Sequence, residues 1–237
     1  IVRAVLHRRK LWGRLADDYQ SLAEQSRGPG RALSDDEERR LFEKAASRPG
    51  WQAAYYASLL AANTTARGCE LRGLRLEDAD LIEGVIRVRR ISTKTDAGCR
   101  VIPLNGTAKW AAARLLERAQ AFGATEAGHY LFPACESHRI DVTRPQTTWR
   151  TAWRNLTKEA GLKGLRFHDL RHHGITKLAE AGVPDQTLMA IAGHVSREML
   201  EHYSHIRQKA KREAVEAIDS YRPAESIADD SAAGSVN

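Results

Sequence analysis

The octapeptide Arg166-Phe-His-Asp-Leu-Arg-His-His173 contains the most informative residue spacing in the chain. His168 and Arg171 are three residues apart, so within a helix they lie on one face and reach the same oxygen atoms. A planar guanidinium beside an imidazole offers hydrogen-bond donors that suit a phosphate group. The spacing therefore predicts a helix that begins here and presents a phosphate-binding pair.

Two short motifs follow the octapeptide. The apolar run 188–192 ends at the pair Gly193-His194, which predicts a turn after a helix. Tyr203 stands nine residues beyond His194. A tyrosine hydroxyl is able to act as a nucleophile and form a covalent intermediate. The second half of the chain thus carries phosphate-binding groups and a candidate nucleophile.

Two more motifs precede the octapeptide. Arg67 and Glu70, an arginine and an acid three residues apart, come after an apolar segment with helical spacing. Apolar and basic residues alternate over 86–89, and a second apolar stretch follows at 100–103. This pattern predicts a β-hairpin that carries Lys94 near its tip.

These five motifs, in this order, resemble those of the tyrosine recombinases, the phage-integrase family. The resemblance extends over most of the chain, although each motif alone is common. It implies a mainly α catalytic domain with a small antiparallel β-sheet, an α+β fold, over residues 34–222. The family usually has a Gly two residues before its first catalytic Arg, where this chain has Thr65. A glycine there suits a tight or left-handed turn, which a threonine adopts less readily.

The resemblance also divides the rest of the chain. Residues 1–25 are expected to be the last helix of a truncated core-binding domain, followed by a linker over 26–33. From the residues alone, a surface helix of a single domain explains the first segment equally well. Residues 223–237 are small and polar and are expected to form a disordered tail. Because the sequence begins with Ile1 rather than Met, we expect natural residues to be missing before it.

Local patterns predict the elements between these limits. Ser34-Asp-Asp-Glu37 is a capping box, so a helix should begin there and run to about Ala46. Residues 123–144 are expected to be irregular. Further helices are predicted over residues 51–62, 107–121, 146–160, 169–181, 185–192 and 197–219. The hairpin region 81–103 is predicted to be a basic patch, with five bases at 87, 89, 90, 94 and 100 against two acids at 83 and 96.

The family chemistry implies that a tyrosine attacks a DNA phosphate, leaving a 3′-phosphotyrosine link and a free 5′ hydroxyl. By this resemblance Tyr203 is the nucleophile. A tyrosine hydroxyl has an unperturbed pKa of about 10, so it needs an acceptor for its proton and an electropositive phosphate to attack. Arg67 and Arg171 are expected to supply the positive charge, whose hydrogen bonds strengthen as charge develops on the phosphate oxygens.

The remaining roles are implied in the same way. His168 is expected to be the general base or a phosphate-positioning donor, and His194 a second donor. Lys94 is the expected general acid for the departing 5′ oxygen, Glu70 orients Arg67, and His172 has a supporting family counterpart. The resemblance implies no metal or nucleotide cofactor. It implies double-stranded DNA as the partner, bound by a homo-tetramer on paired sites.

Each of these residues also has a purely structural interpretation, and taken singly that interpretation is the stronger one. The alternatives are an Arg67–Glu70 ion pair, a solvated Lys94, a polar helix start at His168 and Arg171, a helix–helix turn at Gly193-His194, and a half-buried Tyr203. Only the joint order of the motifs favours the functional interpretation.

The histidine content raises the question of a zinc site. His168 and His172 form an i, i+4 pair, and His173, His202 and His205 add further imidazoles. No Glu follows the first His as in a zinc-protease helix, and the charge of Arg171 would repel a cation. We therefore expect no metal site.

Composition sets wider bounds. The 237 residues carry a net charge of +7, which is compatible with a polyanionic partner. No apolar run is long enough to cross a bilayer. The three cysteines form no Cys-x-x-Cys pair, which argues against a disulfide framework and favours a reduced, cytoplasmic setting.

The function predicted from these features is that of a site-specific recombinase or integrase. Two alternatives share parts of the pattern, namely a type IB topoisomerase and a non-catalytic basic DNA-binding protein. A metallohydrolase built on the histidines comes last.

Overall fold

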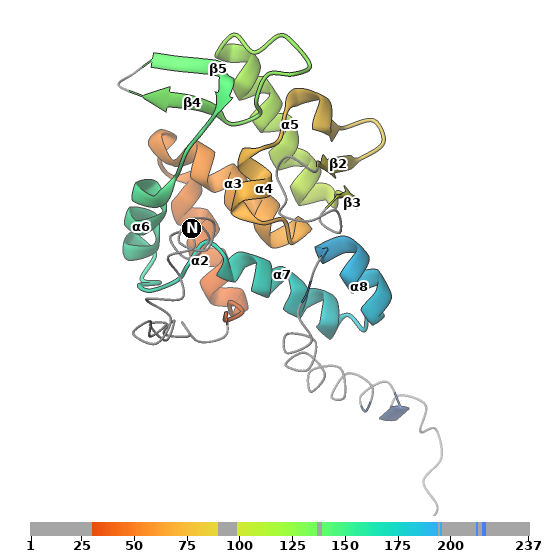
Figure 1. Cartoon of the computed structure of the whole chain (residues 1–237). Helices are drawn as coiled ribbons and strands as arrows, with labels where there is room; N and C mark the ends of the chain where they lie inside the picture. The colour runs from red at the N-terminus through yellow and green to blue at the C-terminus, as the bar shows by residue number, and fades with distance from the viewer. Residues whose placement is uncertain are drawn as a thin grey trace, which may run out of the picture.

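The computed structural model describes residues 30–89, 99–136, 139–193, 195, 212, 215 and 216 (Figure 1). The expected helix over 1–25, the first half of the linker, the hairpin tip, most of the helix over 197–219 and the tail lie outside the described residues. In chain order the elements are α2 (Asp35–Ala46), η2 (Pro49–Trp51), α3 (Gln52–Thr64), α4 (Gly68–Arg72), η3 (Leu76–Asp78), β1 (Ala79–Asp80), β2 (Val85–Val88), β3 (Arg100–Pro103), α5 (Gly106–Ala121), β4 (Pro133–Glu136), β5 (Arg139–Pro145), α6 (Arg150–Glu159), α7 (Asp169–Glu180) and α8 (Asp185–Ala192).

Helix α3 lies at the centre of the fold and packs against α2, α5 and α7 (Figure 1). It is apolar on nearly all sides, as expected of a helix surrounded by other helices. Small residues let α7 approach closely: a Cβ atom added to Gly174 would lie 2.4 Å from the carbonyl oxygen of Ala62. Glycine is therefore required at this crossing of α3 and α7.

The predicted capping box at the start of α2 is confirmed. The Ser34 hydroxyl accepts a hydrogen bond from the Glu37 backbone N–H, and the Glu37 carboxylate accepts one from the Ser34 N–H. These two bonds satisfy backbone donors that a helix start leaves unpaired. Leu41 and Ala45 on the inner face of α2 are buried in the main core.

The predicted hairpin region forms part of a three-stranded antiparallel sheet in the order β1-β2-β3. Ile86 of β2 pairs with Ile102 of β3, and both are fully buried. Arg87 and Val101 are paired one residue along and are exposed, as the two-residue period of a strand requires.

The expectation of irregular structure over 123–144 is wrong in part. Strands β4 and β5 pair there in a second antiparallel sheet, with a register shift beside Pro133. Most residues of this hairpin are exposed or half-buried on both faces. The alternation of apolar and polar residues that reveals a half-buried strand is therefore absent.

Helices α7 and α8 share a small core of their own, formed by Ile175, Ala179, Leu188, Ala192 and Val195. This cluster fixes the end of α8, where Gly193 follows. Both helices agree with the predicted ranges to within a residue or two. No helix in the described part of the chain is long and apolar enough to span a membrane.

Candidate functional site

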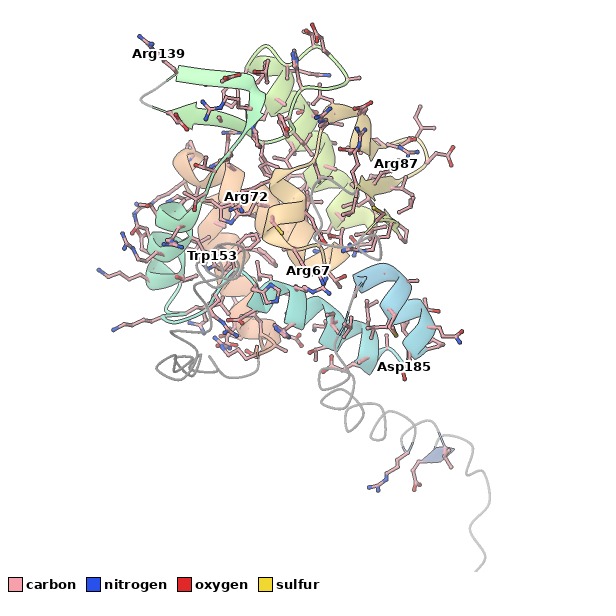
Figure 2. All side chains as sticks on the ribbon, in the orientation of Figure 1. Arg67, Arg72, Arg87, Arg139, Trp153 and Asp185 are labelled. Atoms are coloured by element: carbon pink, nitrogen blue, oxygen red, sulfur yellow. The ribbon has the colours of Figure 1, made fainter. Side chains whose placement is uncertain are left out.

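Arg67 is the N-cap residue of the short helix α4 and lies between α4 and the α7–α8 pair (Figure 2). Its Nη1 donates to Oε1 of Glu70 at 2.8 Å, and its backbone N–H donates to Oε2 at 2.8 Å. The Glu70 side chain is 1% exposed, whereas that of Arg67 is 28% exposed. Glu70 thus holds the backbone N–H and one guanidinium nitrogen of Arg67, while part of the side chain stays accessible to a ligand.

The carboxylate of Glu70 has a second partner that the residue spacing does not predict. Arg100 donates to both of its oxygens, from Nη1 at 3.1 Å and from Nη2 at 2.9 Å. Burial alone would raise the pKa of Glu70, but the hydrogen bonds from Arg100 and Arg67 outweigh it and hold the pKa below its usual value. Glu70 is therefore a buried anion between two guanidiniums.

Arg100 also reaches the end of α8. Its Nε donates to the carbonyl oxygen of Ile191 at 2.7 Å. Gly193 packs against the same guanidinium and has φ 73° and ψ −151°, a backbone conformation that is essentially restricted to glycine. Arg100 therefore links β3, α4 and the residue that precedes His194.

Arg171 makes a parallel connection from α7. Its side chain is buried, and Nη1 donates to the carbonyl oxygens of Thr65 at 2.5 Å and Ala192 at 2.8 Å. Thr65 has φ 56° and ψ 13°, so this residue ends α3 in the left-handed region. The left-handed turn that the family's usual glycine implied is present, and a threonine adopts it.

His168 lies at the start of α7, with part of its surface exposed. Desolvation, followed by the positive charges of His172, Arg171 and Arg67, lowers the pKa of His168 to about 4. Its ring and that of His172 are in edge-to-face contact, with centroids 5.2 Å apart. His168 is consequently a neutral imidazole at pH 7 that is able to accept a proton.

The backbone brings the two halves of the site together. Phe167, which precedes His168, packs on Gly68, which follows Arg67. The structure thus places Arg67, Glu70, His168, Arg171 and His172 in one region. Lys94, His194 and Tyr203 lie outside the described residues, so their positions remain predictions.

His173 differs from its neighbours because it is structural. It is buried, its Nδ1 accepts from the Leu33 N–H at 3.2 Å, and its Nε2 lies 3.4 Å from Glu38. These contacts tie α7 to the start of α2. Within the described ranges, no group of three or more His, Cys, Asp or Glu residues is arranged to hold a metal ion.

The expectation of a basic hairpin patch is wrong for the described residues. Arg87 pairs with Asp80, Arg89 pairs with Glu77 and Asp78, and Arg100 pairs with Glu70. These acids precede residue 81, so the count of charged residues over 81–103 does not include them. The two-residue period of a strand could have identified Arg100 as an inward-facing residue, because it lies two residues before Ile102 and so on the same face of β3.

Comparison with known proteins gives a consistent assignment. The chain is 31% identical to the shufflon-specific DNA recombinase of Escherichia coli over 184 residues, 77% of this chain and 42% of that protein. The crystal structure of XerA recombinase superposes with a TM-score of 0.61 at 25% identity, covering 92% of this chain and 75% of that one. The Tn1549 transposon integrase in complex with transposon right-end DNA shares the fold, with a TM-score of 0.65 at 23% identity, over 87% of this chain and 70% of that one.

The chain spans about half or less of the length of the curated relatives that it matches. A family model described as the phage integrase family matches residues 31–210, which include the motifs around Arg67, His168 and Tyr203. The mostly helical fold with small antiparallel sheets is that of the catalytic domains in this family. The chain therefore belongs to the phage integrase family, the tyrosine recombinases.

Proposed function

We propose that this chain is the catalytic part of a site-specific DNA recombinase that breaks and rejoins strands through a 3′-phosphotyrosine intermediate, without a metal ion. The main support is the convergence of Arg67, Arg171 and His168 from two distant segments on one region. Two further facts agree with a DNA substrate: the Escherichia coli relative is a DNA recombinase, and the Tn1549 integrase structure contains DNA.

In the proposed first step, the Tyr203 oxygen attacks the scissile phosphorus and the bond to the 5′ oxygen breaks. The proposed acceptor of the tyrosine proton is His168, whose lowered pKa leaves the imidazole neutral at pH 7 with an acceptor nitrogen. Lys94 donates a proton to the departing 5′ oxygen. The second step reverses these transfers with the hydroxyl of a partner strand as the nucleophile, so the bond energy is kept in the phosphotyrosine link.

Rate acceleration in this scheme comes from charge that is already in position. The guanidinium of Arg67 is held by Glu70, and that of Arg171 by two backbone carbonyls. Neither side chain has to reorganise as negative charge develops on the phosphate oxygens. His194 is the proposed additional donor, and His172 supports His168 through their ring contact.

The test is a nicked suicide duplex that carries the cognate site, incubated without metal and analysed on a denaturing gel. A covalent protein–DNA band is expected for the wild type and should vanish in Tyr203→Phe, while DNA retention persists. Arg67→Ala should slow formation of the band on the order of a hundredfold, since it removes charge stabilisation in the transition state. If the wild type retains DNA but forms no covalent band, the proposal is refuted in favour of a non-catalytic DNA-binding protein.

The same proposal includes assembly. We infer that residues 34–222 form the catalytic domain and that four copies act on two duplexes. Sedimentation of the chain with a duplex that carries the cognate site should then give a protein-to-duplex ratio of two in a complex that holds two duplexes. A single copy per duplex at saturating protein would exclude this assembly for the chain as it stands.

A further inference from the structure

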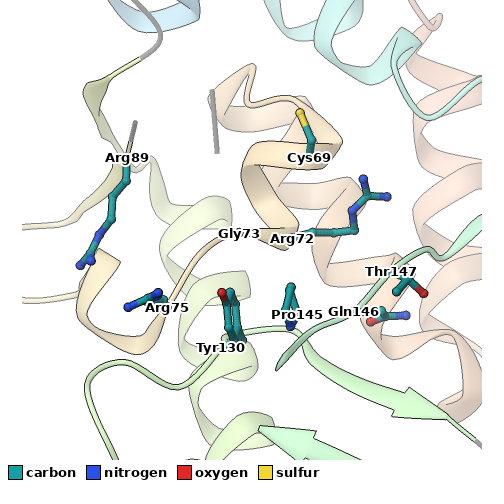
Figure 3. A pocket seen from close by; sticks show the side chains of 9 residues that line it. All are labelled: Cys69, Arg72, Gly73, Arg75, Arg89, Tyr130, Pro145, Gln146 and Thr147. Carbon is teal, nitrogen blue, oxygen red and sulfur yellow. The ribbon is translucent and has the colours of Figure 1, made fainter. Parts of the chain in front are cut away.

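A pocket of about 430 Å³ adjoins the candidate site (Figure 3). One edge is formed by α4, through Cys69 and Arg72, and continues to Gly73 and Arg75. The other lining residues are Arg89, Tyr130, Pro145, Gln146 and Thr147. The volume lies in the range of roughly 300–1,000 Å³ that is typical of ligand pockets.

Two arginines in this pocket are held by aromatic rings. The guanidinium of Arg72 lies over the Trp149 ring at 5.6 Å, and that of Arg75 lies over the Tyr130 ring at 5.5 Å. Figure 3 shows Arg75 and Tyr130 side by side on the same edge of the pocket. Stacking orients a guanidinium plane while its N–H groups can still donate.

No carboxylate of the residues that the structure describes neutralises the charge of these two arginines. Among the described residues, neither Arg72 nor Arg75 forms an ion pair with a carboxylate, whereas Arg89 pairs with Glu77 and Asp78. The lining set in the described part of the chain contains no Asp or Glu. Both arginines are half-buried, so the pocket concentrates positive charge in partly desolvated surroundings.

Neutral polar groups complete the pocket. Gln146 and Thr147 follow the end of β5, and the Gln146 amide donates to the Thr148 carbonyl oxygen at 3.1 Å, which fixes its orientation. Thr147 is exposed. Hydroxyl and amide groups next to arginines are the donors that commonly contact the DNA backbone.

We propose that this pocket binds a non-scissile phosphodiester of the same DNA strand that the candidate site cleaves. The inference rests on the proposed function. Arg72 is five residues beyond Arg67 on one helix, which corresponds to about 7.5 Å at 1.5 Å per residue. Phosphates of one strand rise about 3.4 Å per nucleotide along the duplex axis, so those beside the scissile phosphate lie within a comparable reach of it. A strand whose scissile phosphate lies at Arg67 therefore presents a neighbouring phosphate to the pocket.

The experiment measures duplex binding by fluorescence anisotropy across a range of KCl concentrations. It compares the wild-type chain with an Arg72→Gln/Arg75→Gln variant on a labelled duplex of arbitrary sequence, because backbone contacts do not depend on base sequence. The slope of log K against log salt should become shallower by about 0.9 for each phosphate that the variant no longer neutralises. Affinity should fall by a similar factor on every duplex tested.

Arg139→Gln is the control: it makes the same substitution, for one positive charge rather than two, at an exposed position on the β4–β5 hairpin, far from Arg72 in Figure 2. Its salt slope should equal that of the wild type. An ethylation-interference experiment, on the suicide duplex that carries the cleavage site, adds a second test. Ethylation of one phosphate beside the scissile position should weaken wild-type binding and have no further effect on the double variant.

The outcomes separate the two proposals. If the wild type binds with a steep salt dependence and forms the covalent band, but the double variant behaves like Arg139→Gln, the pocket proposal is overturned and the proposed function stands. If the wild type neither binds DNA nor forms the band, both are overturned. Saturable binding of inorganic phosphate by the wild type, with unchanged DNA slopes in the double variant, would identify a small-anion site instead.

Discussion

The guanidinium of Arg100 and the carboxylate of Glu70 form a two-pronged ion pair whose side chains are 6% and 1% exposed. The pair connects β3, at the base of the hairpin predicted to carry Lys94, with the helix that holds Arg67. Through the Ile191 carbonyl it also reaches the turn before His194. Arg100 thus connects three segments of the candidate site to one another.

Arg100→Met is expected to destabilise the fold by about 3–5 kcal/mol, because it leaves the Glu70 carboxylate buried with one partner fewer. Urea unfolding provides the measurement. The exposed pair Arg114–Glu117 is the control, and Arg114→Met should change the free energy of unfolding by no more than about 1 kcal/mol.

A double-mutant cycle sharpens this prediction. Arg100→Met combined with Glu70→Leu removes the uncompensated charge, so the double variant should be less destabilised than the sum of the two single changes. Strict additivity of the two free-energy changes would show that the pair does not act as a buried ion pair.

Thr65→Gly should stabilise the protein by about 1 kcal/mol, measured as a shift of the unfolding midpoint at constant m value. Thr65 is in the left-handed region, and its buried hydroxyl has no hydrogen-bond partner among the described residues. Glycine removes both penalties at the cost of greater freedom in the unfolded chain. Thr65→Ala removes the hydroxyl but keeps a non-glycine residue in the left-handed region, so it should yield a smaller gain; a destabilised glycine variant would contradict the argument.

Gly193→Ala should cost about 1–3 kcal/mol, since its backbone angles lie in the glycine-only region and the new Cβ would lie 3.1 Å from Nη1 of Arg100. Gly182→Ala is the matched control: Gly182 also has a positive φ, of 74°, but open space surrounds its Cβ position. Thermal unfolding of both variants checks the difference. Equal losses would mean that contact with Arg100 contributes nothing.

The pKa of His168, lowered to about 4 from 6.5, has a consequence for stability. Between these two pH values the unfolded chain binds the proton and the folded chain does not, so the free energy of unfolding falls as the pH falls through this window. Above pH 6.5 the contribution is constant. His168→Gln should reduce this part of the pH dependence, and histidine NMR titration of the wild type should place the midpoint of residue 168 near 4. A midpoint at the ordinary histidine value would refute the assigned environment.

Interactions between residues that are close along the chain could be predicted from the sequence alone. The Ser34–Glu37 box predicts the start of α2 because both partners lie within one turn. The spacing of His168 and Arg171 predicts the start of α7 for the same reason, and the family's glycine position indicates the left-handed turn that Thr65 adopts. In each case the interacting groups are close along the chain.

Contacts between distant residues were decided only by folding. Nothing near Arg100 in the chain indicates that its partner is Glu70, thirty residues away, or that Arg171 binds the carbonyl of Thr65, 106 residues away. The exposed β4–β5 hairpin lacks a patterned face, and the acids that neutralise Arg87 and Arg89 precede the hairpin. The order of the motifs therefore identifies the candidate chemistry. Burial and pairing across the core determine which arginines are bonded to other protein groups in the interior and which remain accessible to a ligand.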